Sequence, residues 1–170
     1  MWSRGQVDVV WGSEIKQFPY VRPLLSELPE HTQTEVADWR GLGYTNEHLM
    51  GMFYNSKNSM PDWCDTVANA IGLKDCGFCF YKMTTCDILP AHVDHVSTYM
   101  KVFNKSRGDI WRAIVFLEEW KPGHYFEIDG QAVVNYSAGE YIIWPIDTPH
   151  AAANIGLEDR YTLQITGIKG

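Results

Sequence analysis

The sequence predicts a mainly β domain, an antiparallel sandwich or barrel with flanking helices packed on its outside. Three observations lead to this fold class. From Gly77 onward, short apolar and aromatic runs alternate with turn-forming residues, as they do in antiparallel sandwiches and barrels. No helical spacing of apolar residues interrupts this part of the chain. Asp129-Gly130 separates two of the runs, and it is a strong hairpin signal because glycine accepts a positive φ.

The amino-terminal half carries the predicted helices. The short apolar run Val7–Trp11 is expected to form a strand. Tyr20–Leu28 is expected to form a short helix with Pro23 in its first turn. Met60–Gly72 is the better helix candidate, because its apolar residues recur at helical spacing and Gly72 suits a helix end.

The second half supplies the predicted strands. They are Phe78–Thr85, Thr98–Phe103, Ile110–Glu118, His124–Ile128, Gln131–Tyr136, Tyr141–Trp144 and Arg160–Thr166. Turn residues at 121–123, 138–139 and 154–156 separate several of these strands. The 170 residues therefore predict a single domain in which residues 1–76 form a helical or mixed support and residues 77–167 form the β core.

Charge and composition exclude several classes of function. Lys and Arg number 14 against 21 Asp and Glu, so the net charge is −7, which argues against general nucleic-acid binding. An aromatic content of 14% argues against intrinsic disorder. No apolar run approaches the ~20 residues that cross a bilayer, so no membrane partner is expected. The segment Met1–Gln6 lacks the apolar run of a signal peptide, and a cytoplasmic protein is expected.

Four cysteines, Cys64, Cys76, Cys79 and Cys86, occur in the sequence. The pair Cys76-x-x-Cys79 raises the possibility of a redox or zinc site. No second such pair supplies the remaining ligands of a zinc site, and Cys76 and Cys79 border an apolar run. We therefore expect reduced thiols that pack as small apolar side chains.

The strongest chemical signal is His92-x-Asp94. In an extended backbone, side chains two residues apart point to the same face, so this imidazole and carboxylate can converge on one cation. His150 follows the predicted strand Tyr141–Trp144 and is the expected third ligand. Two histidines and one carboxylate form the facial triad that suits Fe(II) and oxygen chemistry. His95 is an alternative ligand, although it points away from the Asp94 face if the strand continues.

Arg160 is the second signal, because it is the only arginine after Arg112. It shares one face of the last predicted strand with Thr162. If that face lines a pocket, the guanidinium and the hydroxyl together can bind a carboxylate. If it faces water, the two residues belong to a solvated strand edge.

In this order, His92-x-Asp94, His150 and Arg160-x-Thr162 resemble the Fe(II)/2-oxoglutarate-dependent oxygenase superfamily. The resemblance covers about residues 77–167. It implies a double-stranded β-helix, the jelly-roll fold of cupin-like proteins. It also implies iron held by the two histidines and the aspartate, 2-oxoglutarate chelated to that iron, and O2 as the oxidant. Arg160 with Thr162 would bind the far carboxylate of 2-oxoglutarate.

The resemblance is to hydroxylases of the aspartyl/asparaginyl or prolyl type, and it assigns two further residues. Arg112 lies in an apolar run and would contact a carboxylate of cosubstrate or substrate; the alternative is a surface arginine on an edge strand. Tyr81 would donate a hydrogen bond to 2-oxoglutarate. The implied reaction is hydroxylation of a small molecule, an amino acid or a peptide side chain, with release of succinate and CO2.

Two other classes of function remain open from the sequence. One is a cupin-like metal enzyme that uses the same triad without 2-oxoglutarate, for which Arg160 would have no carboxylate to bind. The other is a non-catalytic β-sandwich binding module, in which His92, Asp94 and His150 would lie apart and bind no metal.

Overall fold

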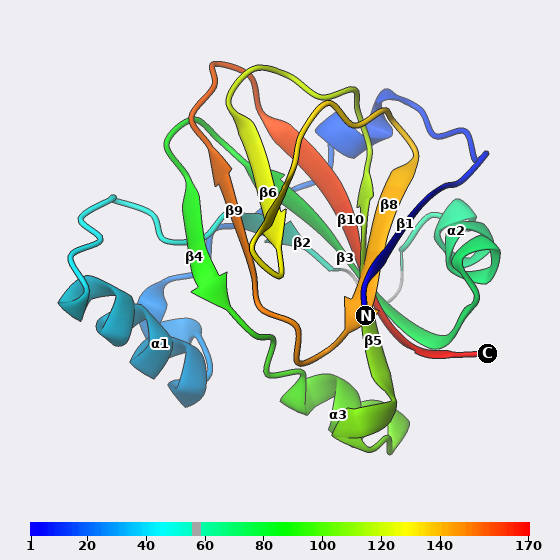
Figure 1. Cartoon of the computed structure of the whole chain (residues 1–170), viewed down its shortest axis with the longest axis horizontal. Coiled ribbons are helices and arrows are strands. Elements are labelled where there is room, and N and C mark those ends of the chain that lie inside the picture. The colour runs from blue at the N-terminus through cyan, green and yellow to red at the C-terminus, as the bar shows by residue number, and fades with distance from the viewer. Residues whose placement is uncertain (56–58) are drawn as a thin grey trace.

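The computed structural model describes residues 1–55 and 59–170, which form two antiparallel sheets with helices at their margins (Figure 1). The larger sheet has the strand order β1-β8-β5-β10-β3-β2, and the smaller has the order β4-β9-β6-β7. The two sheets face each other as a jelly roll. The predicted fold class, mainly β with flanking helices, is therefore confirmed.

The elements have the following bounds. The strands are β1 (Ser3–Gln6), β2 (Met52–Tyr54), β3 (Leu73–Met83), β4 (Ile88–His92), β5 (Ile110–Phe116), β6 (His124–Ile128), β7 (Gln131–Val133), β8 (Glu140–Pro145), β9 (His150–Asn154) and β10 (Arg160–Lys169). The α-helices are α1 (Glu30–Gly41), α2 (Trp63–Ile71) and α3 (Ser97–Phe103), and single 3-10 turns occur at Ser13–Lys16, Leu25–Glu27 and Arg107–Asp109. None of the helices in these described residues is long and apolar enough to cross a bilayer.

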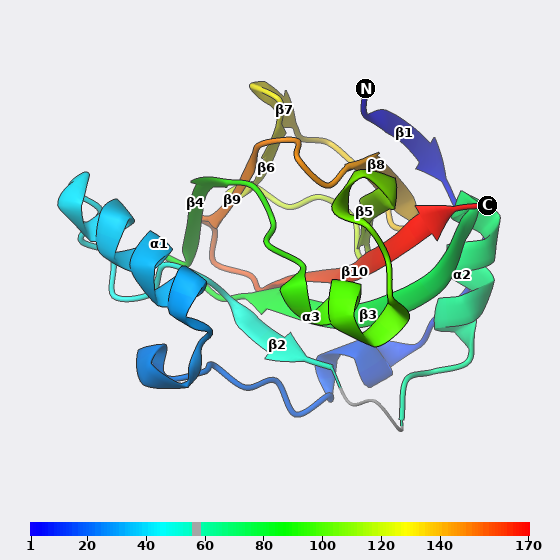
Figure 2. The same ribbon diagram turned by 90° about the horizontal axis from the view of Figure 1, so that it is seen from below.

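The helices lie around the two sheets at different places. Figure 2 shows α1 beside β4 and β2, and α2 at the opposite side of the molecule next to β3. Helix α3 lies at one end of the sheets, below β5 in Figure 1. Residues of α1 lie next to the candidate site described below.

β10 divides the interior because its two faces have different chemistry. Tyr161, Leu163 and Ile165 belong to an apolar cluster on the outer face of the large sheet, which α2 covers with Cys64 and Val67. The opposite face of β10 looks into the space between the sheets, and it carries polar residues. These inward residues are Arg160, Thr162, Gln164 and Thr166. The strand alternation predicted from the sequence therefore holds, and the polar face is the inner one.

The predicted hairpin at Asp129-Gly130 is confirmed between β6 and β7. Ile128 pairs with Gln131, and the two turn residues have φ of 51° and 73°. Both values are positive, as a type I′ turn requires. Gly72 likewise ends α2 with a φ of 83°, so the predicted helix over Met60–Gly72 is present as Trp63–Ile71.

The predicted strand Thr98–Phe103 is wrong, because this segment forms helix α3. Its apolar residues fit a helix as well as a strand, since a short apolar run does not separate the two. In the helix Tyr99 stacks on Phe103 at 4.6 Å between ring centroids, and Tyr99 is buried against Ile110 and Ile146. Tertiary packing, which the local pattern does not contain, decides the conformation.

The amino-terminal predictions need three corrections. The first strand is Ser3–Gln6 rather than Val7–Trp11, since pairing with β8 stops at Gln6 and the chain then turns away. Tyr20–Leu28 forms only the short turn Leu25–Glu27 rather than a helix. Helix α1 was not predicted, because Val36 and Trp39 are its only buried residues and the rest of its sequence is polar.

The remaining strands agree with prediction in position and differ in length. β3 begins at Leu73, before the expected start, and β7 ends at Val133. β10 continues to Lys169, and β1 and β2 from the amino-terminal part form the two edges of the large sheet. β4 and β9 were not predicted as strands, and both carry residues of the candidate site.

Candidate metal centre

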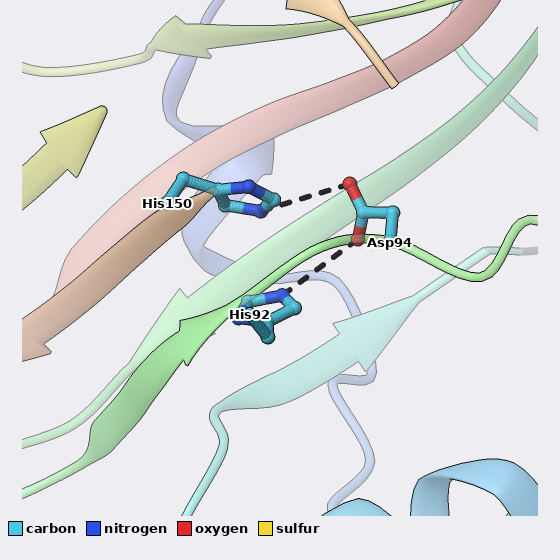
Figure 3. A group of neighbouring side chains, drawn as sticks. All are labelled: His92, Asp94 and His150. Carbon is cyan, nitrogen blue, oxygen red and sulfur yellow. Dashed lines mark ion pairs between the residues drawn. The ribbon is translucent and has the colours of Figure 1, made fainter. Parts of the chain in front are cut away.

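The pairing of β4 with β9 brings two histidines together. His92, the last residue of β4, lies directly opposite His150, the first residue of β9, and their ring centroids are 4.4 Å apart. Asp94 follows two residues after His92 and turns its carboxylate toward both rings (Figure 3). One ligand atom from each of the three residues lies within 4.8 Å of the other two, so this group could hold a metal ion.

Both imidazoles are oriented with Nε2 toward the carboxylate. Nε2 of His92 lies 3.8 Å from Asp94 Oδ1, and Nε2 of His150 lies 3.6 Å from Asp94 Oδ2. Each Nδ1 is next to a backbone carbonyl, that of Pro90 at 2.8 Å and that of Thr148 at 3.1 Å. A carbonyl only accepts hydrogen bonds, so Nδ1 carries a proton, and Nε2 is the nitrogen that faces a metal bound beside the carboxylate.

The ionisation states also suit a cation. Burial lowers the pKa of His150 to about 4, so this imidazole is neutral at neutral pH. Burial alone would raise the pKa of Asp94, but the positive charge of Arg112 and the interaction with His92 outweigh it and hold that pKa low. Burial opposes protonation of His92 too, yet the neighbouring Asp94 carboxylate raises its pKa overall. A bound cation would replace that proton.

Two arginines hold Asp94 in place. Arg107 donates from Nη2 to the backbone carbonyl of Asp94 at 2.8 Å and pairs with Asp147. Arg112 places Nε 3.4 Å from Asp94 Oδ2. That oxygen is buried and accepts no hydrogen bond from any described residue, so it keeps lone pairs for a ligand. Arg107 was not singled out from the sequence, because its role depends on a turn that brings distant segments together.

Arg112 faces the interior, which contradicts the alternative of a surface arginine. Its side chain is 18% exposed, and it donates to Thr166 Oγ1 and Gln164 Oε1, each at 2.5 Å. The carboxylate that it contacts here belongs to Asp94. A contact of Arg112 with cosubstrate or substrate therefore stays a prediction. In the structure, Arg112 contacts the candidate metal ligand Asp94.

A pocket of about 240 Å³ opens over the three ligands. Its inner wall consists of residues from both sheets, among them Tyr81, Phe126, Trp144 and Gln164. Tyr81 accepts a hydrogen bond from the Gly51 amide at 2.5 Å, and burial raises its pKa, so the phenol keeps its proton and can donate it. Tyr81 is therefore positioned to donate a hydrogen bond to a molecule in the pocket, and its contact with a cosubstrate stays a prediction.

Arg160 lies deeper than the pocket wall and is 1% exposed, so the alternative of a solvated strand edge is wrong. Its Nε lies 3.4 Å from Tyr136 Oη, and its Nη1 lies 3.5 Å from Met83 Sδ. Its Cζ lies 5.6 Å and 6.0 Å from the ring centroids of Phe116 and Phe126. No carboxylate among the described residues pairs with this guanidinium, which leaves a buried charge without a counter-ion.

Three buried polar atoms in this part of the interior have no hydrogen-bond partner among the described residues. They are Arg160 Nη2, Thr162 Oγ1 and Trp144 Nε1. Buried donors are rarely left unpaired, because each lost hydrogen bond costs about 1–3 kcal/mol. An uncompensated guanidinium with unpaired donors in its neighbourhood has the chemistry of an anion site. Trp144 fills the core and also lines the pocket.

Other predicted residues take minor positions. His95 lies outside the group that could hold a metal in the described chain, and its ring packs on His31 at 4.3 Å between centroids. Burial raises the pKa of Cys76 to about 12 and of Cys79 to about 11, as expected of thiols in apolar surroundings. His31 is half-buried and lines the pocket.

Comparison with solved structures finds a similar fold in a prolyl-4-hydroxylase from Pseudomonas putida. The two chains are 14% identical with a TM-score of 0.57, and the match covers 99% of this chain and 92% of the other. A predicted oxalate decarboxylase from Thermotoga maritima has 13% identity, a TM-score of 0.43 and coverages of 69% and 79%. A cupin protein from Bacteroides fragilis has 14% identity, a TM-score of 0.42 and coverages of 68% and 86%.

No protein-family model and no curated protein sequence matches the chain. The likeness to the prolyl-4-hydroxylase establishes the jelly-roll fold, and at this identity it establishes the fold alone. The chemistry must therefore be argued from the site.

Proposed function

We propose that this chain is an Fe(II)- and 2-oxoglutarate-dependent dioxygenase that hydroxylates a small molecule, an amino acid or a peptide side chain. The observation that carries the proposal is the buried Arg160 guanidinium, which has no counter-ion in the described part of the chain. It lies on the same sheet face as Arg112, which contacts Asp94. A buried charge is expensive unless it is paired. A cosubstrate with two carboxylates would pair with it at one end and reach the metal group at the other.

Three residues would hold the metal: His92, Asp94 and His150. Two imidazole nitrogens and one carboxylate oxygen are the donor set of non-haem Fe(II) sites. The backbone carbonyls of Pro90 and Thr148 fix the ring orientations, and Arg112 with Arg107 fixes Asp94. The pocket that these three residues line would then be left for further ligands.

The cosubstrate would be held by the inward face of β10 and its neighbours. Arg160 would bind the far carboxylate, and Thr162 Oγ1 and Trp144 Nε1 would supply donors that are unpaired in the structure. Tyr81 would donate its phenol proton to the bound dicarboxylate. Arg160 does not line the pocket, so we expect side chains such as Phe126, 6.0 Å from its Cζ, to move when a carboxylate enters.

With iron bound, the site would supply the chemistry that couples 2-oxoglutarate and O2 to insertion of one oxygen atom into a substrate C–H bond. The products balance as hydroxylated substrate, succinate and CO2. The chain's own part is to anchor the dicarboxylate, to hold His150 unprotonated, and to surround the reacting atoms with apolar walls that exclude water.

Anaerobic titration of 2-oxoglutarate into the Fe(II)-loaded chain tests the proposal. A visible metal-to-ligand absorption band and, on admission of O2, iron-dependent formation of succinate are expected. Stoichiometric iron binding without the band would favour the cupin-type metal enzyme that does not use 2-oxoglutarate. Failure to bind iron would favour the non-catalytic binding module, and either result would overturn the proposal.

A further inference from the structure

Helix α1 contributes part of the pocket wall. His31, Thr32, Glu35 and Trp39 from this helix line the pocket together with His92. The turn that follows β4 contributes Val93, His95 and Val96 to the same lining. A substrate bound in the pocket near the candidate metal ligands would therefore contact a helix face and the turn that carries Asp94.

Among the described residues that line the pocket, Glu35 is the one carboxylate outside the candidate metal ligands. Its side chain is half-buried, and it forms no ion pair or hydrogen bond with any residue of the described chain. It is close enough to His92 for its negative charge to act on that ring. A half-buried carboxylate in a concave pocket attracts positive charge, because the low-dielectric walls strengthen its field.

The cationic side chains around the pocket do not neutralise Glu35. Arg112 is engaged by Asp94, Gln164 and Thr166. His31, one helical turn before Glu35, packs its ring against His95 instead. A bound metal would neutralise the charge of Asp94, so Glu35 would be the remaining carboxylate among the described residues that line the pocket.

Trp39 supplies a flat wall beside this charge. It lies one turn after Glu35 on α1, it is 5% exposed, and its ring contacts His92 edge to face at 6.0 Å between centroids. Indole faces pack against aliphatic stems and attract cations. Glu35 and Trp39 together present a counter-ion and an aromatic wall next to the candidate metal ligand.

We propose that the pocket selects a substrate with a cationic side chain, an ammonium or a guanidinium, that Glu35 pairs with and Trp39 packs against. This inference rests on the proposed function, since it names the substrate class of the same site. The competing interpretation is that Glu35 is a solvated helix residue, as Asp38 is on the exposed side of α1.

Matched small probes test the inference without knowledge of the natural substrate. The probes are the N-acetyl amides of lysine and arginine, the neutral norleucine derivative and the anionic glutamate derivative. Binding is measured by calorimetry on the full chain loaded with Zn(II) and 2-oxoglutarate, so that no turnover consumes the probe. We expect at least one cationic probe to bind about tenfold or more tightly than the neutral one, and the glutamate derivative to bind weakest.

Charge variants of α1 supply the controls. Glu35→Gln removes the charge with little change of shape, and the preference for the cationic probe should fall to about one. Glu35→Lys should reverse the preference in favour of the glutamate derivative. Asp38→Asn makes the same charge change on the exposed side of α1 and should leave the preference intact. Equal binding of cationic and neutral probes to the unchanged chain, or an unaltered preference in Glu35→Gln, would overturn the inference.

The two proposals fail in different ways. Absence of the Fe(II)–2-oxoglutarate absorption band and of succinate would overturn the proposed function, and the probes can still be titrated into the metal-free chain. Presence of both signals with no cation preference would overturn only the role of Glu35. Aerobic incubation with Fe(II), followed by mass spectrometry for a gain of one oxygen atom, shows whether the ammonium or the guanidinium probe is the better substrate.

Discussion

The inner face of β10 has an inward-facing arginine near each end, and the two arginines differ in their counter-ions. At the metal end, Gln164 and Thr166 hold Arg112, which pairs with Asp94 beside two histidines. At the other end, the contacts of Arg160 with the described residues are to a phenol, a thioether and aromatic rings. At the metal end, each of these charges is therefore near an opposite charge of the protein. At the Arg160 end, the described residues supply no carboxylate, and under the proposed function a bound anion would supply it.

This difference separates what each end contributes to the protein. Residues at the metal end stabilise one another, so removal of one leaves another charge unpaired. Arg160 costs stability as long as its charge has no partner, because a buried unpaired ion is unfavourable. Under the proposed function, the carboxylate of a bound ligand would compensate this charge. Each prediction below perturbs one end and leaves the other as its reference.

The largest effect is expected at the metal end from Asp94→Ala. The variant loses the only carboxylate of the group and leaves Arg112 without its counter-ion. Iron affinity should fall by more than about a hundredfold, and iron-dependent turnover should be lost. Colorimetric iron determination after gel filtration measures the loss, with the exposed Asp8→Asn as the matched charge control. Full iron-dependent succinate formation by Asp94→Ala would refute the ligand assignment.

At the other end, Arg160→Met should separate binding from stability. The affinity for 2-oxoglutarate should fall by about a hundredfold or more, because the counter-ion of the far carboxylate is gone. The melting temperature of the ligand-free chain should stay constant or rise, since an unpaired buried charge is replaced by an apolar side chain of similar length.

Arg160→Lys provides the matched control, since it keeps the charge but loses the planar fork and should bind 2-oxoglutarate with intermediate affinity. Anaerobic titration and thermal unfolding are measured on the same preparations. A large drop in melting temperature in Arg160→Met would show that the guanidinium is structural and would remove the contrast between the two ends.

Arg112→Met is expected to have a smaller effect, centred on the metal end. Arg112 is not itself a candidate metal ligand. Its Nε lies 3.4 Å from Asp94 Oδ2 and so orients that ligand. Iron affinity should fall by about tenfold to a hundredfold, as observed when a group that orients a ligand is removed. Binding of 2-oxoglutarate to the iron-loaded variant should change less than in Arg160→Met. The reverse order would show that Arg112 contacts the cosubstrate directly, as the sequence suggested.

The smallest effect concerns pH and the surroundings of Arg160. Burial lowers the pKa of His124, and the nearby Arg160 charge lowers it further, although a hydrogen bond to the Glu158 carbonyl opposes this. A histidine whose pKa is lower in the folded chain disfavours folding as pH falls through its unfolded value of about 6.5. Stability should therefore drop modestly between about pH 7 and pH 5.

A variant comparison isolates this contribution. His124→Gln should flatten the pH dependence of the melting temperature, and Arg160→Met should weaken it because a like charge is removed. Thermal unfolding at a series of pH values in one mixed buffer measures both slopes. An identical slope in all three chains would exclude His124 as the titrating group.

The sequence predicted the elements that depend on neighbouring residues. The hairpin at Asp129-Gly130 and the helix ending at Gly72 follow from backbone conformations that few residues adopt. Helix α1 was not predicted, and a strand was predicted where helix α3 lies. A mostly polar helix with two buried residues gives a weak periodic signal, and a short apolar run fits both helix and strand.

The candidate site could also be predicted only in part. Its residue types were recognisable from sequence order, because His92-x-Asp94, His150 and Arg160-x-Thr162 combine donors with known chemical preferences. The contacts of Arg107 and the pocket positions of Glu35 and Trp39 were not, since they join segments far apart in the chain. The partner of Arg112 likewise depends on how the turn after β4 folds back.

The sequence by itself determined a mainly β fold, the alternation along the last strand and the chemical character of the donors. Those properties reside in local backbone preferences and in side-chain chemistry. Only the tertiary structure decided that His92 faces His150 across β4 and β9 and that the polar face of β10 is the inner one. It also decided that Arg160 is buried without a counter-ion among the described residues. Strand register and burial arise from packing of the whole chain, so no local pattern specifies them.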